Sequence, residues 1–433
     1  MDGLFTQATR IDEIKGRYDP WVAGSALALA CLGVVMVASS SIAVGENLDV
    51  GPFYFLIRHL LFLIIGLGLA WGAMRTELKT VERYNHLLLL GCFVLLILVF
   101  VPVIGSSVNG ARRWINLGVS RFQTVEAVKL MFIVWLASYL VRFSGDVAVT
   151  WLAMLKPVGV AVGLVILLLL QPDFGSSSLL LAIAAGMLML GGVNMPRMFG
   201  PVLIGLPLLA IIAIAEPYRM RRLTSFADPW ADPFGIGYQL TNALMALGRG
   251  EAFGVGIGAS VQKLSYLPEA HTDFIFAIIG EELGFAGVCL VIGLYALLVG
   301  RALYIGLRCV ERRRHFSGYC AFGIALWIGL QGIVSIGVNL GLLPTKGLTL
   351  PLISYGGSSV LMTCVAVGLL LRVSYELERS ERQVAKLRQG AVQQTSPELS
   401  GMTLSGDEMP VMSGGRGIRG RRERIEPTYG ETV

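Results

Sequence analysis

The sequence predicts an all-α, polytopic membrane protein with about ten transmembrane helices and one large extracytoplasmic loop between helices seven and eight. Two counts carry this prediction: apolar residues make up 55% of the 433 residues, and charged residues only 15%. Soluble domains are about 45–50% apolar and about 25% charged, so a soluble fold of this composition would lack the polar surface to cover its core. The third observation is that the apolar residues gather in runs long enough to span a bilayer. These observations exclude an ordinary cytosolic enzyme, a disordered protein and a coiled coil.

Each apolar run, bounded by charged or Gly/Pro-rich stretches, predicts one spanning helix, because a span needs about 20 residues. The fifth and sixth runs are separated only by Gln171-Pro172-Asp173, which predicts a tight turn near one membrane face. The ten runs are residues 21–44, 55–74, 86–104, 122–141, 155–170, 174–191, 198–215, 273–299, 316–341 and 351–374.

Lys and Arg residues set the orientation, since cytoplasmic loops carry an excess of both. One candidate cytoplasmic link holds Arg75, Lys79 and Arg83, and the link between helices eight and nine holds the run 312–314. Both termini are therefore expected in the cytoplasm. The net charge of +6 reflects this bias rather than a nucleic-acid partner.

Three regions follow from this layout: a cytoplasmic segment at 1–20, a membrane domain at 21–375 and a cytoplasmic tail at 376–433. The tail starts with charged residues and becomes rich in Ser, Gly and Gln, which predicts a helical extension leading into a largely disordered segment. Its last arginines form a cluster that suits an anionic lipid, a partner or plain solvation.

Two outer loops stand out. The loop between helices three and four carries Arg112, Arg113 and Arg121 against the expected orientation, which suits either an anion site or pairing with lipid phosphates. The loop 216–272 is rich in aromatic residues, Gly and Pro, and its length indicates function. Within it, 238–247 reads as a short amphipathic helix.

Asp273 stands where this large loop becomes helix eight. Carboxyl groups at a membrane boundary tend to be functional, and the helix dipole there favours the ionised form. Asp273 suits a general base, and it equally suits an N-cap. Glu269 and His271 are weaker candidates nearby. Glu281, eight residues on and roughly 80° around the helix, is expected to face the same cavity, whereas Glu282 is expected to pair with another helix.

Polar residues inside other spans give further candidates. Glu126 and Lys129 lie three apart on helix four and are expected to form an ion pair, either a structural clamp or part of a substrate path. Gln331 and Asn339 on helix nine are expected to make interhelical hydrogen bonds.

The link between helices nine and ten carries Lys346, followed by the small-residue run 354–359 with Ser354 and Ser358. Such a run permits close helix approach or a helix break that exposes N–H groups to a phosphate.

Four stretches together resemble the SEDS family (shape, elongation, division and sporulation), and its division branch more than its elongation branch. The resemblance covers roughly residues 20–375. The stretches are NGARRWINLG at 109–118, QPDFGSS at 171–177, LPEAHTDFIFAIIGEELG at 267–284 and PTKGLTLPLISYGGSS at 344–359.

The resemblance implies a ten-helix inner-membrane glycosyltransferase that polymerises lipid II at the division septum. It also implies a class B penicillin-binding protein, a transpeptidase, as partner, together with other division proteins. The family's essential Asp falls on Asp273, and its paired Glu and Lys fall on Glu126 and Lys129. The family usually reads QPSE where this chain has Gln123-Thr124-Val125-Glu126, which puts the start of that helix in doubt.

The expected reaction is an inverting displacement of lipid pyrophosphate by the acceptor sugar's 4-hydroxyl, with Asp273 as base. Arg112, Arg113, Lys346 or the group Arg219, Arg221 and Arg222 would stabilise the leaving group. Related enzymes suggest Mg²⁺ or Mn²⁺ as an aid, but the sequence has no closed set of metal ligands. A lipid-linked precursor transporter, a non-catalytic division scaffold and an elongation-type polymerase stay open as alternatives.

Overall fold

The computed structural model describes residues 15–400, apart from short gaps at 109, 117, 119, 194–195, 198–199, 202, 204, 206, 208–209, 212–213, 215–216 and 265. The chain forms two compact units, Met1–Gln383 and Val384–Val433. Within the second unit, the described residues 384–400 are helical.

Seven described helices are long and apolar enough to cross a membrane, and two shorter apolar helices accompany them. The seven long helices confirm seven of the ten predicted spans, and the two shorter helices lie at the predicted spans 86–104 and 174–191. The tenth predicted span, at 198–215, falls largely outside the described residues. The long helices are α2 (Pro20–Asn47), α3 (Tyr54–Arg75), α6 (Thr124–Arg142), α8 (Trp151–Leu170), α13 (Ile275–Glu311), α14 (His315–Asn339) and α15 (Gly357–Ser400); the shorter ones are α5 (Asn85–Leu98) and α9 (Phe174–Leu190). The chain is thus a multi-pass membrane protein.

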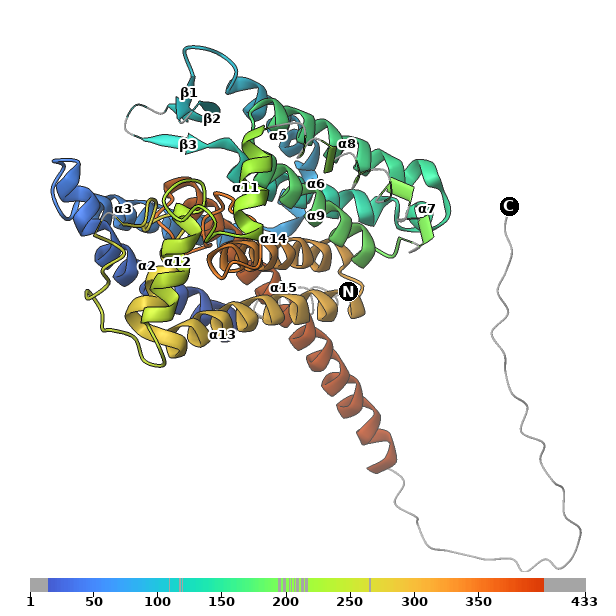
Figure 1. The fold of residues 1–433 in the computed structure, drawn as a ribbon. Coiled ribbons are helices and arrows are strands. Elements are labelled where there is room, and N and C mark those ends of the chain that lie inside the picture. Colours follow the sequence, from blue (N-terminus) through green and yellow to red (C-terminus); the bar gives the residue numbers. More distant parts are fainter. Residues whose placement is uncertain are drawn as a thin grey trace, which may run out of the picture. The chain divides into compact units, whose positions relative to one another are not determined.

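Among the described residues, four short helices lie between the spans: α4 (Leu78–Arg83), α7 (Ser144–Val149), α11 (Pro217–Ala227) and α12 (Tyr238–Arg249). The helix α12 confirms the amphipathic helix expected at 238–247. One face of α12 buries Leu240, Ala243 and Ala246 and packs against α13 (Figure 1). The large loop is therefore seated on the membrane helices.

A small antiparallel sheet occupies the link between α5 and α6, where the sequence predicts only a loop. Its strands, in the order β1 (Gly105–Val108), β2 (Ala111–Asn116) and β3 (Arg121–Gln123), pair in sequence. Asn109-Gly110 is a typical hairpin signal, and Gly110 has φ +79°. The otherwise all-α prediction holds, and α6 starts at Thr124 directly after the sheet, without a side-chain N-cap.

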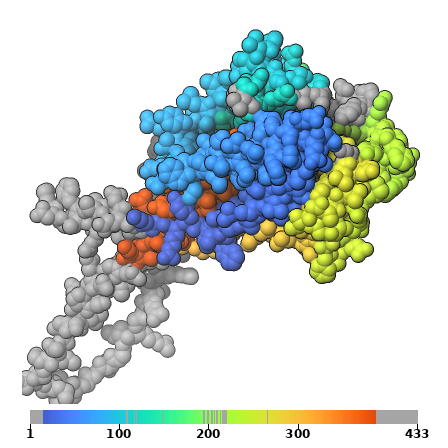
Figure 2. Space-filling view, turned by 90° about the vertical axis from the view of Figure 1, so that its left-hand side faces the viewer, coloured from blue at the N-terminus to red at the C-terminus, as the bar shows by residue number. Residues whose placement is uncertain are grey.

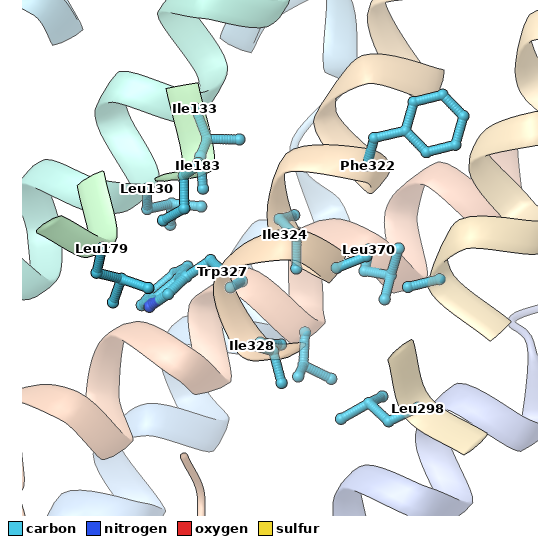
Figure 3. Packing of buried hydrophobic residues seen from close by; sticks show 14 of the residues in the cluster. Leu130, Ile133, Leu179, Ile183, Leu298, Phe322, Ile324, Trp327, Ile328 and Leu370 are labelled. Atoms are coloured by element: carbon cyan, nitrogen blue, oxygen red, sulfur yellow. The ribbon is translucent and has the colours of Figure 1, made fainter. Parts of the chain in front are cut away.

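The core lies around α6 and α14. In α6, 89% of the residues in its most apolar stretch are buried, against 17% in α3. The helix α6 is therefore central, and α3 faces lipid. Figure 3 shows Trp327 of α14 directed toward Leu130 and Leu179 of α6 and α9, while Leu298 and Leu370 lie on the other side of α14. Figure 2 shows one side of the molecule, which α2 and α3 cover in blue and which the yellow loop after α12 borders.

The helix α13 is broken at Gly284, whose φ of +67° and ψ of −164° are not helical. The loop 251–256 fills the break. Val255 and Gly256 donate N–H groups to the Glu281 and Glu282 carbonyls at 3.0 and 3.1 Å, and Phe285 donates to the Glu251 carbonyl at 2.9 Å. Because a backbone inside a membrane needs all its polar groups paired, the loop supplies what the broken helix lacks.

Candidate active site

A cavity of about 1000 Å³ opens where segments far apart in the sequence meet. Its walls come from the sheet, the α8–α9 turn, α11, the segment before α13 and the link between α14 and α15. Every stretch that carried the family resemblance contributes to this cavity. Its polar lining includes Arg113, Gln123, Asp173, Arg222, Gln239, Glu269, Thr272, Asp273, Thr345, Lys346, Thr349, Tyr355, Ser358 and Ser359.

Asp273 lies in this wall, partly buried, one residue before the N-cap of α13. The N-cap is Phe274, whose side chain makes no capping hydrogen bond, so Asp273 does not act as the N-cap. Burial raises the pKa of Asp273 to about 7; Glu269 adds to this, and Arg222 opposes it. Burial thus outweighs the helix dipole expected from the sequence, and the pKa suits a general base near neutral pH.

Two neighbours shape the surroundings of this carboxyl group. A Cβ atom at Gly347 would lie 2.9 Å from Asp273 Oδ2, so only glycine lets the link between α14 and α15 approach so closely. Glu269 is exposed, and its Oε2 accepts a hydrogen bond from Thr272 Oγ1 at 2.6 Å. The peptide N–H groups of Thr272 and Phe274 both donate to the Glu269 carbonyl, which forms the tight turn before Asp273.

Three cationic side chains line the cavity: Arg113, Arg222 and Lys346. Burial lowers the pKa of Lys346, and Asp173 opposes this shift; its ammonium lies over the Phe174 ring and 3.4 Å from Ser178 Oγ. Arg222 donates to the Thr345 carbonyl at 2.9 Å, on the same link as Lys346. Two of the three cations therefore gather at this link.

Arg112 and Arg113 are neighbours on β2, and their side chains point to opposite sides because successive strand residues alternate in direction. Arg113 donates to the carbonyls of Gln171 and Pro172 in the α8–α9 turn and lies 4.0 Å from Asp173. Arg112 is exposed and is not part of the cavity lining. Arg113 thus ties the sheet to the turn, and Arg112 stands apart from the site.

The small-residue run divides in the same way. Ser358 lies in the first turn of α15 and lines the cavity. Ser354 is buried, and its Oγ accepts from the Leu350 N–H at 2.8 Å. The sequence predicts that helix ten starts at 351, but residues 351–356 are not helical and α15 starts at Gly357. The N-terminal end of α15 therefore lies at the cavity.

Glu126 and Lys129 form the expected ion pair, 2.8 Å long and buried. Lys129 also donates to Gln331 Oε1 at 2.7 Å, and Gln331 Nε2 donates to the Thr349 carbonyl at 2.9 Å. Neither charged residue lines the cavity. The pair is thus an interhelical clamp between α6 and α14 that reaches the cavity wall only through Gln331.

Glu281 and Glu282 of α13 bind the large loop. Glu281 Oε1 accepts from Arg249 Nη1 at 2.8 Å and from the Val261 N–H at 3.0 Å. Glu282 pairs with Lys263 at 2.8 Å and accepts from Ser39 of α2 at 2.7 Å, as expected for pairing with another helix. Glu281 does not line the Asp273 cavity, contrary to expectation, because the loop covers that side of α13.

His271 is buried beside Phe55 and Tyr355, with ring centroids 4.8 and 5.5 Å apart, and it is not part of the cavity lining. Burial lowers its pKa, and Glu269 opposes that shift. Its carbonyl accepts from the Tyr355 N–H at 2.9 Å. His271 therefore fixes the segment before Asp273 against the start of α15.

Asp173 lines the cavity although it was not among the site residues expected from the sequence. It is the N-cap of α9, with Oδ1 accepting from the Ser176 N–H at 3.1 Å and Oδ2 from Ser176 Oγ at 2.8 Å. An Asp between two apolar runs is a typical N-cap signal, which could have located it.

The carboxyl groups of the cavity do not form a closed metal site of their own. The described residues hold no cluster of three or more His, Cys, Asp or Glu side chains arranged for a metal ion. Both oxygens of Asp173 are already engaged by Ser176. A complete set of Mg²⁺ or Mn²⁺ ligands is therefore not found among the described residues.

Comparison with known proteins agrees with the motifs. The family model of the cell cycle proteins FtsW, RodA and SpoVE matches residues 21–379. The chain is 68% identical to the probable peptidoglycan glycosyltransferase FtsW of Xanthomonas oryzae over 392 residues, covering 90% of this chain and 80% of that one. It is 50% identical to the protein of the same name from Coxiella burnetii, covering 84% and 98%.

Solved structures share the fold. A chain from a study of the structural coordination of polymerization and crosslinking by a peptidoglycan synthase complex matches with TM-score 0.67 and 31% identity, covering 83% of this chain and 98% of that one. The rod shape determining protein RodA of Thermus thermophilus matches with TM-score 0.61 and 29% identity, covering 82% and 96%. The chain therefore belongs to the FtsW/RodA/SpoVE family of cell cycle proteins, which is the SEDS family.

Proposed function

We propose that this chain is a peptidoglycan glycosyltransferase that polymerises lipid II into glycan strands at the division septum. One observation carries the proposal: a partly buried carboxyl group with a pKa near 7 shares a cavity with the cations of Lys346 and Arg222. Relatives that are 68% and 50% identical bear the name of this activity and of FtsW.

In the proposed reaction, Asp273 accepts the proton of the acceptor sugar's 4-hydroxyl. The hydroxyl oxygen attacks the anomeric carbon of the donor, and the bond from that carbon to the lipid pyrophosphate breaks. The pyrophosphate leaves with the bonding electrons, and the anomeric centre is inverted. Lys346, Arg222 and the N-terminal end of α15 face the same cavity and would stabilise the charge that develops on the leaving group.

We propose that both termini lie in the cytoplasm and that the cavity opens on the outer side of the inner membrane. The distribution of Lys and Arg supports this orientation. The partner is proposed to be a class B penicillin-binding protein, acting with other division proteins. Its support is the similarity to a chain from a peptidoglycan synthase complex.

A lipid-linked precursor transporter is the main competing function. It needs polar groups that line a passage near the bilayer midplane. The buried charges of α6, Glu126 and Lys129, are bonded to each other, Lys129 also donates to Gln331, and neither residue lines the cavity. This arrangement favours the polymerase.

The test is reconstitution of the full chain with its transpeptidase partner and lipid II in lipid vesicles, with glycan strands resolved on gels. Asp273→Asn keeps the shape of the side chain and removes the base, so polymerisation should fall by about 10²–10⁴-fold. Asp228→Asn is the matched control, because Asp228 is an exposed carboxylate of the same loop outside the cavity. Normal strands from Asp273→Asn would refute the assignment, and lipid II movement without polymer in the wild type would favour the transporter.

A further inference from the structure

We infer that Asn339 is a positioning residue for the reaction: its side-chain amide holds the carbonyl of Asp273 and the N–H of Ala277, four residues further on. This inference rests on the proposed role of Asp273 as base. Asn339 is the last residue of α14 and has no exposed surface.

Three hydrogen bonds define this role. Asn339 Nδ2 donates to the Asp273 carbonyl at 2.9 Å and to the Ser335 carbonyl at 2.8 Å, and Oδ1 accepts from the Ala277 N–H at 3.1 Å. Only this orientation of the amide satisfies all three, because both neighbours of the nitrogen are carbonyls and the neighbour of the oxygen is an N–H.

Asn339 also supplies a cap that α13 lacks. Ala277 lies in the first turn of α13, where N–H groups have no full helical partner, and no side chain caps the helix at its N-cap Phe274. The Ala277 N–H is shared between the Phe274 carbonyl, also at 3.1 Å, and Asn339 Oδ1. Asn339, on α14, thus caps the N-terminus of α13 and also holds Asp273, which precedes that helix.

The same residue sets the distance between base and cations. Asn339 ends α14, and the chain continues from it into the link that carries Lys346 and Gly347. Gly347 in turn meets the Asp273 carboxyl group. Holding the Asp273 carbonyl at this point therefore fixes the carboxyl group relative to Lys346, and a shift of about 1 Å in such a site costs about 100-fold in rate.

The test compares Asn339→Leu and Asn339→Ser with wild type in the reconstituted complex with lipid II. Leu has nearly the same shape without the amide, and Ser is the milder change because its hydroxyl can bond the Ser335 carbonyl one turn back. We expect kcat per folded molecule to fall by about 100-fold with KM within about 3-fold. The acidic limb of the rate profile should move below pH 7, because a loosened segment lets water reach Asp273.

Ser335→Ala is the matched control: Ser335 is buried one turn away on the same helix, and its Oγ has no hydrogen-bond partner within the described part of the chain. It should keep the wild-type rate and profile. The inference is overturned if both Asn339 variants keep kcat, or if kcat falls while the acidic limb stays in place, which would mark a merely structural role. If Asp273→Asn itself polymerises normally, the proposed function fails instead, so the two failures are distinguishable.

Discussion

At the residue scale, the proposed chemistry depends on what surrounds Asp273. Burial and the nearby Glu269 raise the pKa of its carboxyl group, and Arg222 opposes this shift. Glu269 and Arg222 lie on different segments, so the pKa of Asp273 depends on how these segments pack together.

The first expectation concerns pH. A general base works only when ionised, so the rate should rise with pH through about 7 and level off above it. Glu269 raises the pKa of Asp273, so Glu269→Gln should shift the acidic limb to lower pH. Initial polymerisation rates across pH, with the same partner and lipid, check this. A limb that moves to higher pH would contradict the electrostatic account.

The second expectation concerns the glycine that faces the base. In Gly347→Ala, the new methyl group would lie 2.9 Å from Asp273 Oδ2 and would push the carboxyl group or the link aside. We expect kcat to fall by about 10- to 100-fold. Gly248→Ala in α12 serves as control, since a methyl group there would meet no neighbouring atom within 4 Å. Equal rates for the two variants would show that the site tolerates the shift.

At the element scale, the break in α13 links the large loop to the membrane helices. Close backbone approach needs glycine on both sides: a Cβ at Gly284 would lie 2.3 Å from the Gly254 nitrogen, and Gly284 also has a positive φ. Ion pairs made by the buried Glu281 and Glu282 then hold the loop in place. Backbone packing and ion pairs therefore both hold the large loop against α13, and each can be tested separately.

Substituting the break residue tests the backbone. Gly284→Ala should destabilise the protein by more than about 1–3 kcal/mol, because strained φ and a steric overlap act together. Gly293→Ala, on the same helix with open space around it, should have little effect. Thermal unfolding of the purified protein in detergent measures both, and equal midpoints for the two variants would refute the close-packing argument.

Removing one partner tests the charge. Lys263→Met leaves Glu282 buried without its cation, which costs about 3–5 kcal/mol. Adding Glu282→Gln removes the stranded charge, so the double variant should recover much of that loss. The four proteins form a double-mutant cycle measured by thermal unfolding. Additive losses would mean that the pair does not interact.

At the scale of the whole molecule, orientation decides which side the cavity serves. Ser107 on β1 and Lys79 at α4 are both exposed and lie on opposite sides in the proposed topology. In intact cells, Ser107→Cys should react with a membrane-impermeant maleimide, whereas Lys79→Cys should react only after permeabilisation. The reverse pattern would place the cavity in the cytoplasm and exclude polymerisation on the outer side.

The amino-acid sequence by itself determined the membrane class, nine of the described helices and the boundary position of Asp273. It could do so because lipid requires long apolar helices with paired backbones, which leave a strong and local pattern. It also located Glu126 with Lys129, and Gln331 with Asn339, since polar groups inside spans stand out.

Only the tertiary structure decided which of these residues share the cavity. A helical angle tells which way Glu281 points, but not that the large loop covers that side. Likewise, two adjacent arginines look equal in sequence, and the sheet brings only Arg113 to the cavity. The positioning role inferred for Asn339 rests on its hydrogen bond to Asp273, 66 residues away in the sequence. Such residues meet only when the helices pack.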